Sequence, residues 1–457
     1  MRPHKRRFTE GQRGQGMLEY ALILTALSLM LMATVNVVGR AINGTYCQIS
    51  VGLSLAKGGG CTVSAWGEDG AGELGDNSTT TRATPAVIAK LGPLLQLSSG
   101  FEHNLALAQD GTVWAWGLAG SGQLGNGSNT DTGIPQHITF PASFTNIVQV
   151  SAGSYDSMAL KSDGTIWTWG DNSYGQMAGS VGTAGCAISV YTCPSQVPQT
   201  FDTSAKPTAV AGSHMSEYVL MSDGTVWSWG SNQTGQLGNN TWGGTCCTGG
   251  EGVNTPVQVQ GLPVRATAIA GNQNDTMYAI GADGNVYAWG NNQSGQLGNG
   301  GISSGCGGIC SQVATIVQIP GYPKIVAIAG GANCGYAIDA SGNGWGWGDN
   351  THDQLTSLAS NPQNIPYKMF TSSSGIVAIS GGGEWTGGGA NEDGFVLALT
   401  NTGGVLGWGD NTTDELGTTG GTTWPTALSI PGETKVNAVV AGGFSSYLLN
   451  TKETGSG

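Results

Sequence analysis

The sequence predicts a mainly β protein, in which a seven-bladed β-propeller follows one long N-terminal hydrophobic α-helix. Three observations lead to this prediction. A Trp-Gly pair recurs seven times, at intervals of 50 to 61 residues. Asp-Gly pairs separate short alternating apolar segments, which is a strong signal for a β-hairpin. The uncharged run 20–39 contains about 20 residues, enough for a helix to span a bilayer.

Composition supports a compact β protein. Glycine accounts for 79 of 457 residues, charged residues make up only 10%, and there are 14 tryptophans. Disordered chains are rich in charge and poor in aromatic residues, so this composition argues against disorder. The net charge of −13 excludes nucleic acid as an expected partner, because the phosphate backbone is also negative.

The first 60 residues divide into a basic leader peptide (1–14), a hydrophobic helix (15–42) and a flexible linker (43–60). Basic residues precede the apolar run, which predicts that the N-terminus stays in the cytoplasm and the remainder is exported. Glu19 stands at the start of the run, where a carboxylate is costly in lipid and therefore a functional candidate. A cleaved signal peptide usually has a shorter apolar core, and a plain signal anchor is the other alternative.

The segment from Gly14 to Tyr20, followed by the apolar helix, resembles the N-terminus of type IV pilins of the Flp (tight adherence) class. The resemblance implies that a prepilin peptidase cuts between Gly14 and Gln15. It also implies that Glu19, next to Tyr20, neutralises the free amine of a neighbouring subunit during assembly, since the two charges are tolerable in lipid only together. The implied partners are other copies of the chain through this helix, the peptidase, the assembly machinery and, before assembly, the membrane.

From about residue 60 the chain repeats one plan. A short apolar strand ends in a small residue and Gly, a second strand leads to the Asp-Gly turn, and a third strand runs into Trp-Gly. The final Trp of each unit is expected to pack between blades. The propeller is placed at 61–450 and a tail at 451–457, and one blade is expected to be closed by both ends, because 436–450 lacks the third strand that 61–67 supplies. The seven pairs begin at Trp66, Trp116, Trp169, Trp229, Trp289, Trp347 and Trp408.

These units resemble the repeats of the regulator of chromosome condensation family over residues 60–450. The resemblance rests on GxxHxLAL (100–107), DGTVWAWG (110–117) and GQLGNG (122–127). It implies a seven-bladed propeller, whose radial closure limits exposed strand edges.

Nine cysteines suggest an oxidising compartment. The short spacings indicate disulfide candidates in loops, between Cys186 and Cys193 and between Cys306 and Cys310. A metal site is the alternative, but these spacings with no nearby histidine cluster fit zinc poorly. We therefore expect no metal and no cofactor.

No catalytic motif is present, so the sequence predicts that the chain is not an enzyme. Acid pairs such as Glu68-Asp69 and Asp414-Glu415 follow Trp-Gly, where solvated turns are expected. Binding is more plausible, because the loops after the small-Gly pairs differ between units and should gather on one face around the axis. Unselected variation of the loops is the alternative. The candidate partner-binding residues are Phe101, Glu102, His103, Tyr155, Asp156, His214, Met215, Asn272, Gln273, Asn274, Glu384, Trp385 and Phe444.

The favoured interpretation is a structural subunit of a type IV (Tad/Flp-like) pilus that displays the propeller on the filament for adhesion. It predicts a cell-surface filament whose subunit is first inserted in the cytoplasmic membrane. The alternative is a non-polymerising anchored protein whose propeller binds a protein or glycan, including inhibition of a partner enzyme. Guanine nucleotide exchange, the role of the repeat family's namesake, is disfavoured for an exported acidic chain, and a lyase or hydrolase is disfavoured by the missing catalytic set.

Overall fold

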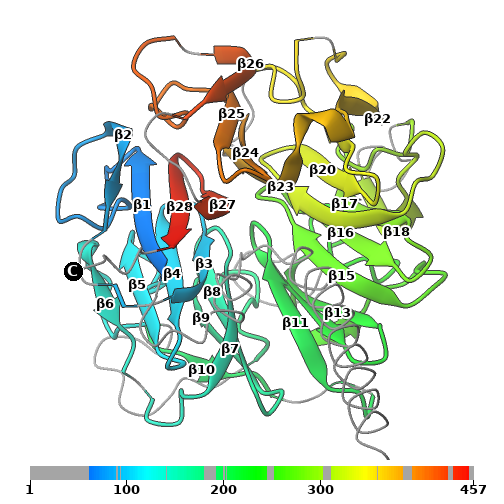
Figure 1. Ribbon diagram of the computed structural model, residues 1–457. Coiled ribbons are helices and arrows are strands. Elements are labelled where there is room, and N and C mark those ends of the chain that lie inside the picture. The colour runs from blue at the N-terminus through cyan, green and yellow to red at the C-terminus, as the bar shows by residue number, and fades with distance from the viewer. Residues whose placement is uncertain are drawn as a thin grey trace, which may run out of the picture.

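The computed structural model describes residues 61–451, except 89–90, 93, 140, 180–191, 199–200, 202, 244–251, 302–309, 358, 384–393, 422 and 431–435. In this part of the chain, the strands form seven four-stranded antiparallel sheets set around a common axis (Figure 1). One short 3-10 helix, η1 (Ser372–Ser374), accompanies them. The predicted seven-bladed propeller is confirmed.

Each blade contributes one strand to each of four concentric positions. The inner strands are β3 (Leu94–Ser99), β7 (Ile147–Ala152), β11 (Pro207–Gly212), β15 (Ala266–Gly271), β19 (Ile325–Gly330), β23 (Ile376–Gly383) and β27 (Val436–Ala441). The second strands are β4 (His103–Ala108), β8 (Asp156–Lys161), β12 (Ser216–Met221), β16 (Thr276–Gly281), β20 (Cys334–Asp339), β24 (Gly394–Thr400) and β28 (Ser445–Thr451). The third strands are β5 (Val113–Gly117), β9 (Ile166–Gly170), β13 (Val226–Ser231), β17 (Val286–Asn291), β21 (Gly344–Gly348), β25 (Val405–Asp410) and β1 (Cys61–Gly67). The outer strands are β6 (Thr132–His137), β10 (Ser195–Gln196), β14 (Gly252–Gln258), β18 (Cys310–Ile316), β22 (Gln363–Phe370), β26 (Thr423–Ser429) and β2 (Arg82–Val87).

We number the blades from one, which contains β3 to β6, to seven, which contains β27, β28, β1 and β2. Blade seven joins both ends of the described chain. Its strands β1 and β28 pair antiparallel from Cys61 opposite Thr451 to Gly67 opposite Ser445 and lie side by side (Figure 1). The inner strand β27 contacts β3 of blade one, which closes the ring. This is the arrangement that the incomplete repeat units at the two ends predict.

In blades one to six, hairpin turns connect the second strand to the third at one end of the propeller, which we call the turn end. In blade one, the amide of Gly111 donates to the carbonyl of Ala108 at 3.0 Å, and Asp110 accepts from the amide of Thr112 at 3.0 Å. Gly111 has φ of +81°, a left-handed conformation that glycine adopts without strain. The Asp-Gly signal therefore predicts this turn correctly.

The tryptophan of each Trp-Gly pair is buried between two blades, as predicted. The structure adds a polar role that the sequence pattern did not reveal. The indole nitrogens of six of the seven donate to a backbone carbonyl of the preceding blade. For example, Trp229 Nε1 lies 2.6 Å from the carbonyl oxygen of Gln176. Trp289 is the exception, because its buried Nε1 has no hydrogen-bond partner. Each of the six indoles therefore combines apolar burial with one directional bond between blades.

The predictions for residues 1–60, including the long helix, the processing site at Gly14 and Gln15, and the assembly residues Glu19 and Tyr20, lie outside the described residues. Among the helices that the structure describes, none has the length and apolar character needed to cross a membrane.

Candidate functional site: the loop face

The candidate functional site is the end of the propeller opposite the hairpin turns. There, in every blade except blade six, whose connection lies outside the described residues, a loop joins the inner strand to the second strand. We call this surface the loop face. It consists of residues 100–102, 153–155, 213–215, 272–275, 331–333 and 442–444.

Each loop is fixed from beneath by the glycine of its own Trp-Gly pair. Gly117 has φ of +101°, and a Cβ there would lie 2.2 Å from the carbonyl oxygen of Glu102. That carbonyl accepts a hydrogen bond from the amide of Leu118 at 2.8 Å. The same arrangement recurs at Gly170, where the carbonyl of Tyr155 accepts from the amide of Asp171 at 2.9 Å. Glycine is required here because any side chain would displace the loop.

The loops also contact one another from blade to blade. The amide of Gly443 donates to the carbonyl of Gly100 at 3.2 Å, and the amide of Ser154 donates to the carbonyl of Ser213 at 3.3 Å. A Cβ on Gly153 would lie 2.9 Å from that same Ser213 carbonyl, so the loops approach too closely for a larger residue. The structure thus brings the variable loops together around the axis.

Three aromatic side chains from consecutive blades form a cluster on the loop face. The ring centroid of Phe101 lies 5.3 Å from that of Tyr155 and 5.7 Å from that of Phe444. All three side chains are only partly buried. We call these residues the aromatic cluster. Aromatic rings of this kind are the typical centre of a protein interface.

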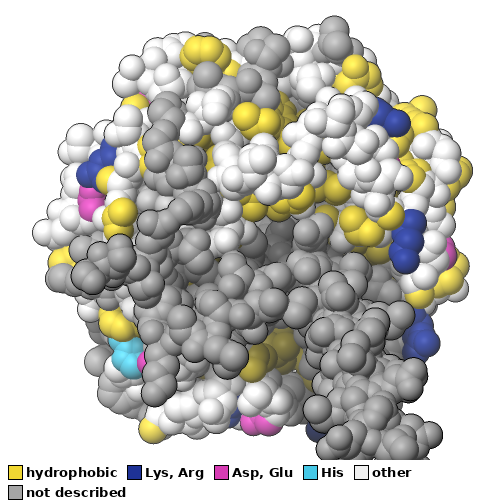
Figure 2. Space-filling view, in the orientation of Figure 1, with side chains coloured by type: hydrophobic (Ala, Val, Ile, Leu, Met, Phe, Trp, Pro, Cys, Tyr) yellow, Lys and Arg dark blue, Asp and Glu magenta, His cyan; other side chains and the backbone are white. Residues whose placement is uncertain are grey.

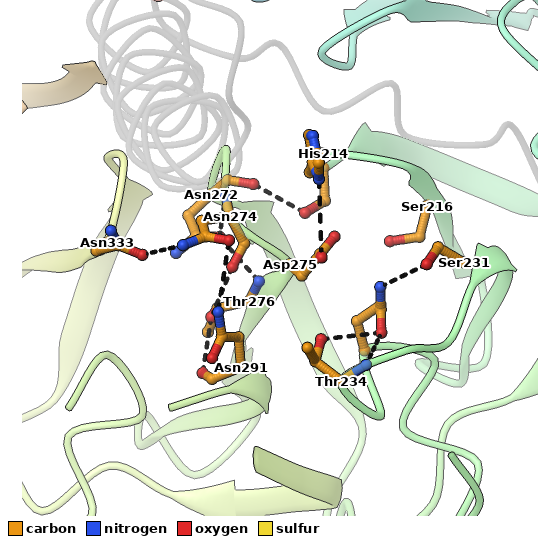
Figure 3. Close-up of polar contacts among 12 residues, drawn as sticks. His214, Ser216, Ser231, Thr234, Asn272, Asn274, Asp275, Thr276, Asn291 and Asn333 are labelled. Atoms are coloured by element: carbon orange, nitrogen blue, oxygen red, sulfur yellow. Dashed lines mark hydrogen bonds and ion pairs between the residues drawn. The ribbon is translucent and has the colours of Figure 1, made fainter. Parts of the chain in front are cut away.

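The opposite side of the loop face is polar (Figure 3). His214 Nδ1 lies 3.7 Å from a carboxylate oxygen of Asp275, and the Asn274 side chain bonds to that of Asn333. The Oδ1 atom of Asn272 accepts from the amides of Asn274 and Thr276 at 3.0 and 2.8 Å. Asn272 and Asn274 are 2% and 6% exposed, so these two side chains stabilise the loop rather than offering a contact surface.

His103 and Asp156 also point inward, contrary to the expectation that they belong to the binding surface. They are 0% and 1% exposed and occupy the same position in successive blades, opposite the glycine of Trp-Gly. His103 Nε2 lies 2.9 Å from Ser157 Oγ of the next blade. Burial lowers the pKa of His103 to about 3, so the imidazole is neutral at physiological pH.

Asp156 faces Glu217 across the interface between blades two and three. Their carboxyl oxygens are buried and have no hydrogen-bond partner. Burial, followed by the charge of Glu217, raises the pKa of Asp156 well above its ordinary value, and burial raises the pKa of Glu217 as well. Both shifts have the direction expected for buried carboxyl groups without a hydrogen-bond partner, because burial disfavours the charged form.

Of the remaining candidates, three lie on the loop face and two lie outside the described residues. Glu102, Met215 and Gln273 are partly exposed on the loop face. Burial, then the nearby Glu68 and Asp131, raises the pKa of the Glu102 carboxyl. Glu384 and Trp385 lie outside the described residues.

The sequence missed several residues that the geometry adds to this face. Asp275 and Asn333 belong to the polar network, and Glu68 and Asp171 each follow a Trp-Gly pair at the edge of a loop. The recurring spacing after Trp-Gly was the signal that could have identified the last two. The expectation that the acid pairs after Trp-Gly are solvated is wrong for two members, since Asp69 and Glu415 are 0% and 1% exposed.

The remaining sequence predictions concern metal ligands and disulfides. Among the described residues, no group of three or more histidine, cysteine or acidic side chains is arranged to hold a metal ion. Cys193 and Cys310 are buried, but Cys186 and Cys306 lie outside the described residues, so the two disulfide pairs stay predictions.

The fold defines a class of protein, the seven-bladed β-propellers, and parts of the chain match the regulator of chromosome condensation repeat. The family model of this sequence repeat matches residues 110–160, 223–277 and 283–338. A second family model with the same description matches residues 95–123 and 147–176.

Among curated proteins, the chain is 28% identical over 297 residues to the human E3 ubiquitin-protein ligase HERC2, covering 64% of this chain and 6% of that protein. It is 26% identical to the Schizosaccharomyces pombe protein pim1, covering 50% and 43%. It is also 25% identical to the mitochondrial RCC1 domain-containing protein RUG3 of Arabidopsis thaliana, covering 59% and 55%. The chain therefore spans only 6% to 55% of the length of these relatives.

Solved structures show the same fold. The human WBSCR16 structure matches with a TM-score of 0.69 at 20% identity, over 86% of this chain and 99% of that one. Prp20p from Saccharomyces cerevisiae matches with a TM-score of 0.70 at 20% identity, over 88% and 93%.

Proposed function

We propose that this chain is a surface-displayed binding protein whose propeller recognises a protein partner through the loop face. The observation that carries the proposal is the aromatic cluster, in which three partly exposed rings meet on loops held rigidly by glycine contacts and interblade hydrogen bonds. A preorganised aromatic patch loses little conformational entropy on binding.

Two solved structures of one relative, Prp20p, support a protein rather than a glycan as the partner. One is described together with its binding to Gsp1p and histones, and the other holds it bound to Kap60. Those partners belong to Prp20p. They support the proposal only by associating this repeat fold with protein binding, and glycan binding and enzyme inhibition are the alternatives.

Photocrosslinking tests the location of the binding surface. A photoreactive phenylalanine analogue replaces Phe101 on the loop face or, as the control, Tyr322, whose side chain is 56% exposed away from that face. We expect a discrete crosslinked adduct on the native cell surface from position 101 and none from position 322. Equal adducts from both positions, or adducts from position 322 alone, would contradict the proposal.

The second candidate is a pilus subunit that carries this binding domain on a filament. The motif from Gly14 to Tyr20 favours it, and the comparisons with known proteins do not address it. The N-terminal peptide mass of protein sheared from the cell surface tests the processing. A start at Gln15 in a filamentous fraction supports the pilus role, whereas a start at Met1 with the protein retained in the membrane supports a monomeric anchored protein.

A further inference from the structure

We propose that the interface between blades two and three holds a divalent cation of the Ca²⁺ type, bound by the carboxyl groups of Asp156 and Glu217. Both residues are buried between the blades and take no part in the aromatic cluster, so this site is independent of the proposed binding function. Ca²⁺ takes about six to eight oxygen ligands, among which carboxylates, backbone carbonyls and water are common.

The neighbouring interface, between blades one and two, shows how polar side chains can be satisfied at this position. His103 and Asp156 occupy the same place in successive blades, opposite the glycine of Trp-Gly. Ser157 and Glu217 occupy the next place, opposite the tryptophan. His103 Nε2 lies 2.9 Å from Ser157 Oγ, so these two polar groups are partners across the interface. The interface between blades two and three has a carboxyl group at both places instead.

Both carboxyl groups are buried without a partner. Asp156 is 1% exposed and Glu217 is 0% exposed, and none of their four carboxyl oxygens forms a hydrogen bond. No Lys, Arg or His in the described part of the chain forms an ion pair with either residue. By contrast, the acidic side chains visible in Figure 2 lie toward the rim of the molecule in that view, where water can solvate them. An unpaired buried carboxylate is costly, whereas a coordinated cation would satisfy both its oxygens and its charge.

Two glycines allow oxygen atoms from both blades to gather at one point. A Cβ on Gly212 would lie 3.1 Å from the Cα of Gly153, so the backbones of the two blades are in contact there. A Cβ on Gly153 would collide with Asp156 Oδ1 and would lie 2.9 Å from the carbonyl oxygen of Ser213. Glu217 Oε2 lies 3.2 Å from the Cβ position of Gly212. Oxygens of three residues therefore surround the contact between the two glycines.

The charge and the donor atoms suit Ca²⁺. Burial, then the charges of Glu217 and Asp171, raises the pKa of Asp156, so the two proposed ligands lie within electrostatic reach of each other. A cation between them would oppose this shift, because opposite charge stabilises the ionised form. The four carboxyl oxygens and the one carbonyl oxygen of Ser213 are candidates for five ligands, and water would supply the rest. Only two of these donors are acidic side chains, which is consistent with the lack of a described group of three or more.

Isothermal titration calorimetry with CaCl₂ tests the proposal on the full chain, purified in detergent and freed of metal with EGTA. The substitutions Asp156→Asn and Glu217→Gln keep the shape of each side chain and remove its charge. Glu415→Gln is the matched control, because it removes a carboxyl group that is also buried but lies in a different interface. Thermal unfolding followed by circular dichroism shows whether each variant folds.

We expect one Ca²⁺ per chain with a dissociation constant at or below about 1 mM. Asp156→Asn and Glu217→Gln should each weaken binding at least about tenfold, and Glu415→Gln should leave it unchanged. Unchanged affinity in both site variants would place the ion elsewhere and overturn the proposal. No binding to the wild-type chain up to about 10 mM CaCl₂ would also overturn it, since the two carboxyl groups must then hold protons.

Terbium luminescence excited through tryptophan decides the question if neither site variant folds. Trp229 lies directly opposite Glu217 in the neighbouring strand, so Tb³⁺ bound at this site would be sensitised efficiently. A signal from the wild-type chain that one equivalent of Tb³⁺ saturates and Ca²⁺ displaces would support the site. Failure to saturate at one equivalent, or to be displaced by Ca²⁺, would overturn it.

Discussion

Two buried glutamates lie at the two interfaces that blade seven, which closes the ring, makes with its neighbours. In six of the seven interfaces between blades, one residue of the loop after Trp-Gly accepts a hydrogen bond on its backbone carbonyl from a tryptophan of the next blade. Glu415 offers its carbonyl to Trp66 Nε1 at 2.7 Å, and Glu73 offers its carbonyl to Trp116 Nε1 at 2.7 Å. These two interfaces lie on either side of blade seven, whose strands come from both ends of the described chain. The other five blades have glutamine at this position. The carbonyls of Gln123, Gln176, Gln296 and Gln354 accept in the same way, whereas the carbonyl of Gln236 accepts from the hydroxyl of Tyr218 in its own blade.

Glutamine and glutamate differ in the second polar atom of the side chain, which is a donor nitrogen in glutamine and an acceptor oxygen in ionised glutamate. Gln354 uses Oε1 to accept from the amide of His352 at 2.9 Å and Nε2 to donate to Asp349 at 2.7 Å. In Glu415 one oxygen likewise accepts from the amide of Thr413 at 3.0 Å, but the residue that matches Asp349 is the carboxylate Asp410. The charge of Asp410 adds to burial in raising the pKa of the Glu415 carboxyl, whose other oxygen accepts from the hydroxyl of Thr413.

The pKa shifts of the two glutamates give the size of their effect on the free energy of unfolding. Burial raises the pKa of Glu73 and of Glu415 from the ordinary 4.5 to about 7 in each case. At about 1.36 kcal/mol per pKa unit, this corresponds to about 3 kcal/mol for each residue. Because the folded state binds the proton more tightly, the stabilisation is fully present below pH 4.5 and is lost as pH rises to about 7.

The variants Glu73→Gln and Glu415→Gln should therefore raise the free energy of unfolding at pH 8 by about 2–3 kcal/mol each, and change it little at pH 4.5. Urea titrations at both pH values, followed by tryptophan fluorescence, measure this difference. The reverse change Gln236→Glu is the control, and it should lower stability at pH 8 by a similar amount. Equal effects of the glutamine variants at the two pH values would refute the reasoning, since a packing effect does not depend on the proton.

Three further predictions concern the glycines, the tryptophans and the N-terminus. Gly117→Ala should lower the free energy of unfolding in urea titrations by more than about 2 kcal/mol, because φ is positive there and the added Cβ would meet a backbone carbonyl. Gly120→Ala, with open space around it, should lower it by less than about 0.5 kcal/mol. Trp229→Phe should destabilise the fold by about 1–3 kcal/mol more than Trp289→Phe in the same assay, because only Trp229 loses an indole hydrogen bond, and equal losses would contradict that role. Glu19→Ala should abolish filaments in electron micrographs while circular dichroism of the propeller stays unchanged, and normal filaments would exclude the assembly role of that carboxylate.

The sequence predicts the fold well because one set of local rules acts seven times. Trp-Gly and Asp-Gly mark strand ends and turns, and their spacing reveals the blades even though each strand is short. The incomplete units at the two ends predict the pairing of β1 with β28, since a blade without its third strand would leave backbone groups unpaired. These features depend on local backbone geometry, which the sequence encodes directly.

The site is harder to predict because neighbouring residues in one loop have opposite fates. Phe101 lies on the loop face, whereas His103, two positions later, begins β4 and points between the blades. All six residues of β4 are buried between blades, so the position at which the strand begins decides whether a side chain lies on the surface or in the core. The pairing of Asp156 with Glu217 depends in addition on how two blades are set against each other, which no local pattern reports.

The direction in which the chain enters the propeller links the fold to the proposed function. Strand β1 begins at Cys61, opposite Thr451 at the turn end, and runs toward Gly67 beside the loop face. Residues that precede β1 therefore join the propeller at the turn end. If residues 15–42 form the predicted anchor, its linker joins the propeller at the turn end, and the aromatic cluster lies at the opposite end of the propeller from this attachment. An attachment at the turn end leaves the loop face free of the connection, which is what the proposed binding through that face requires.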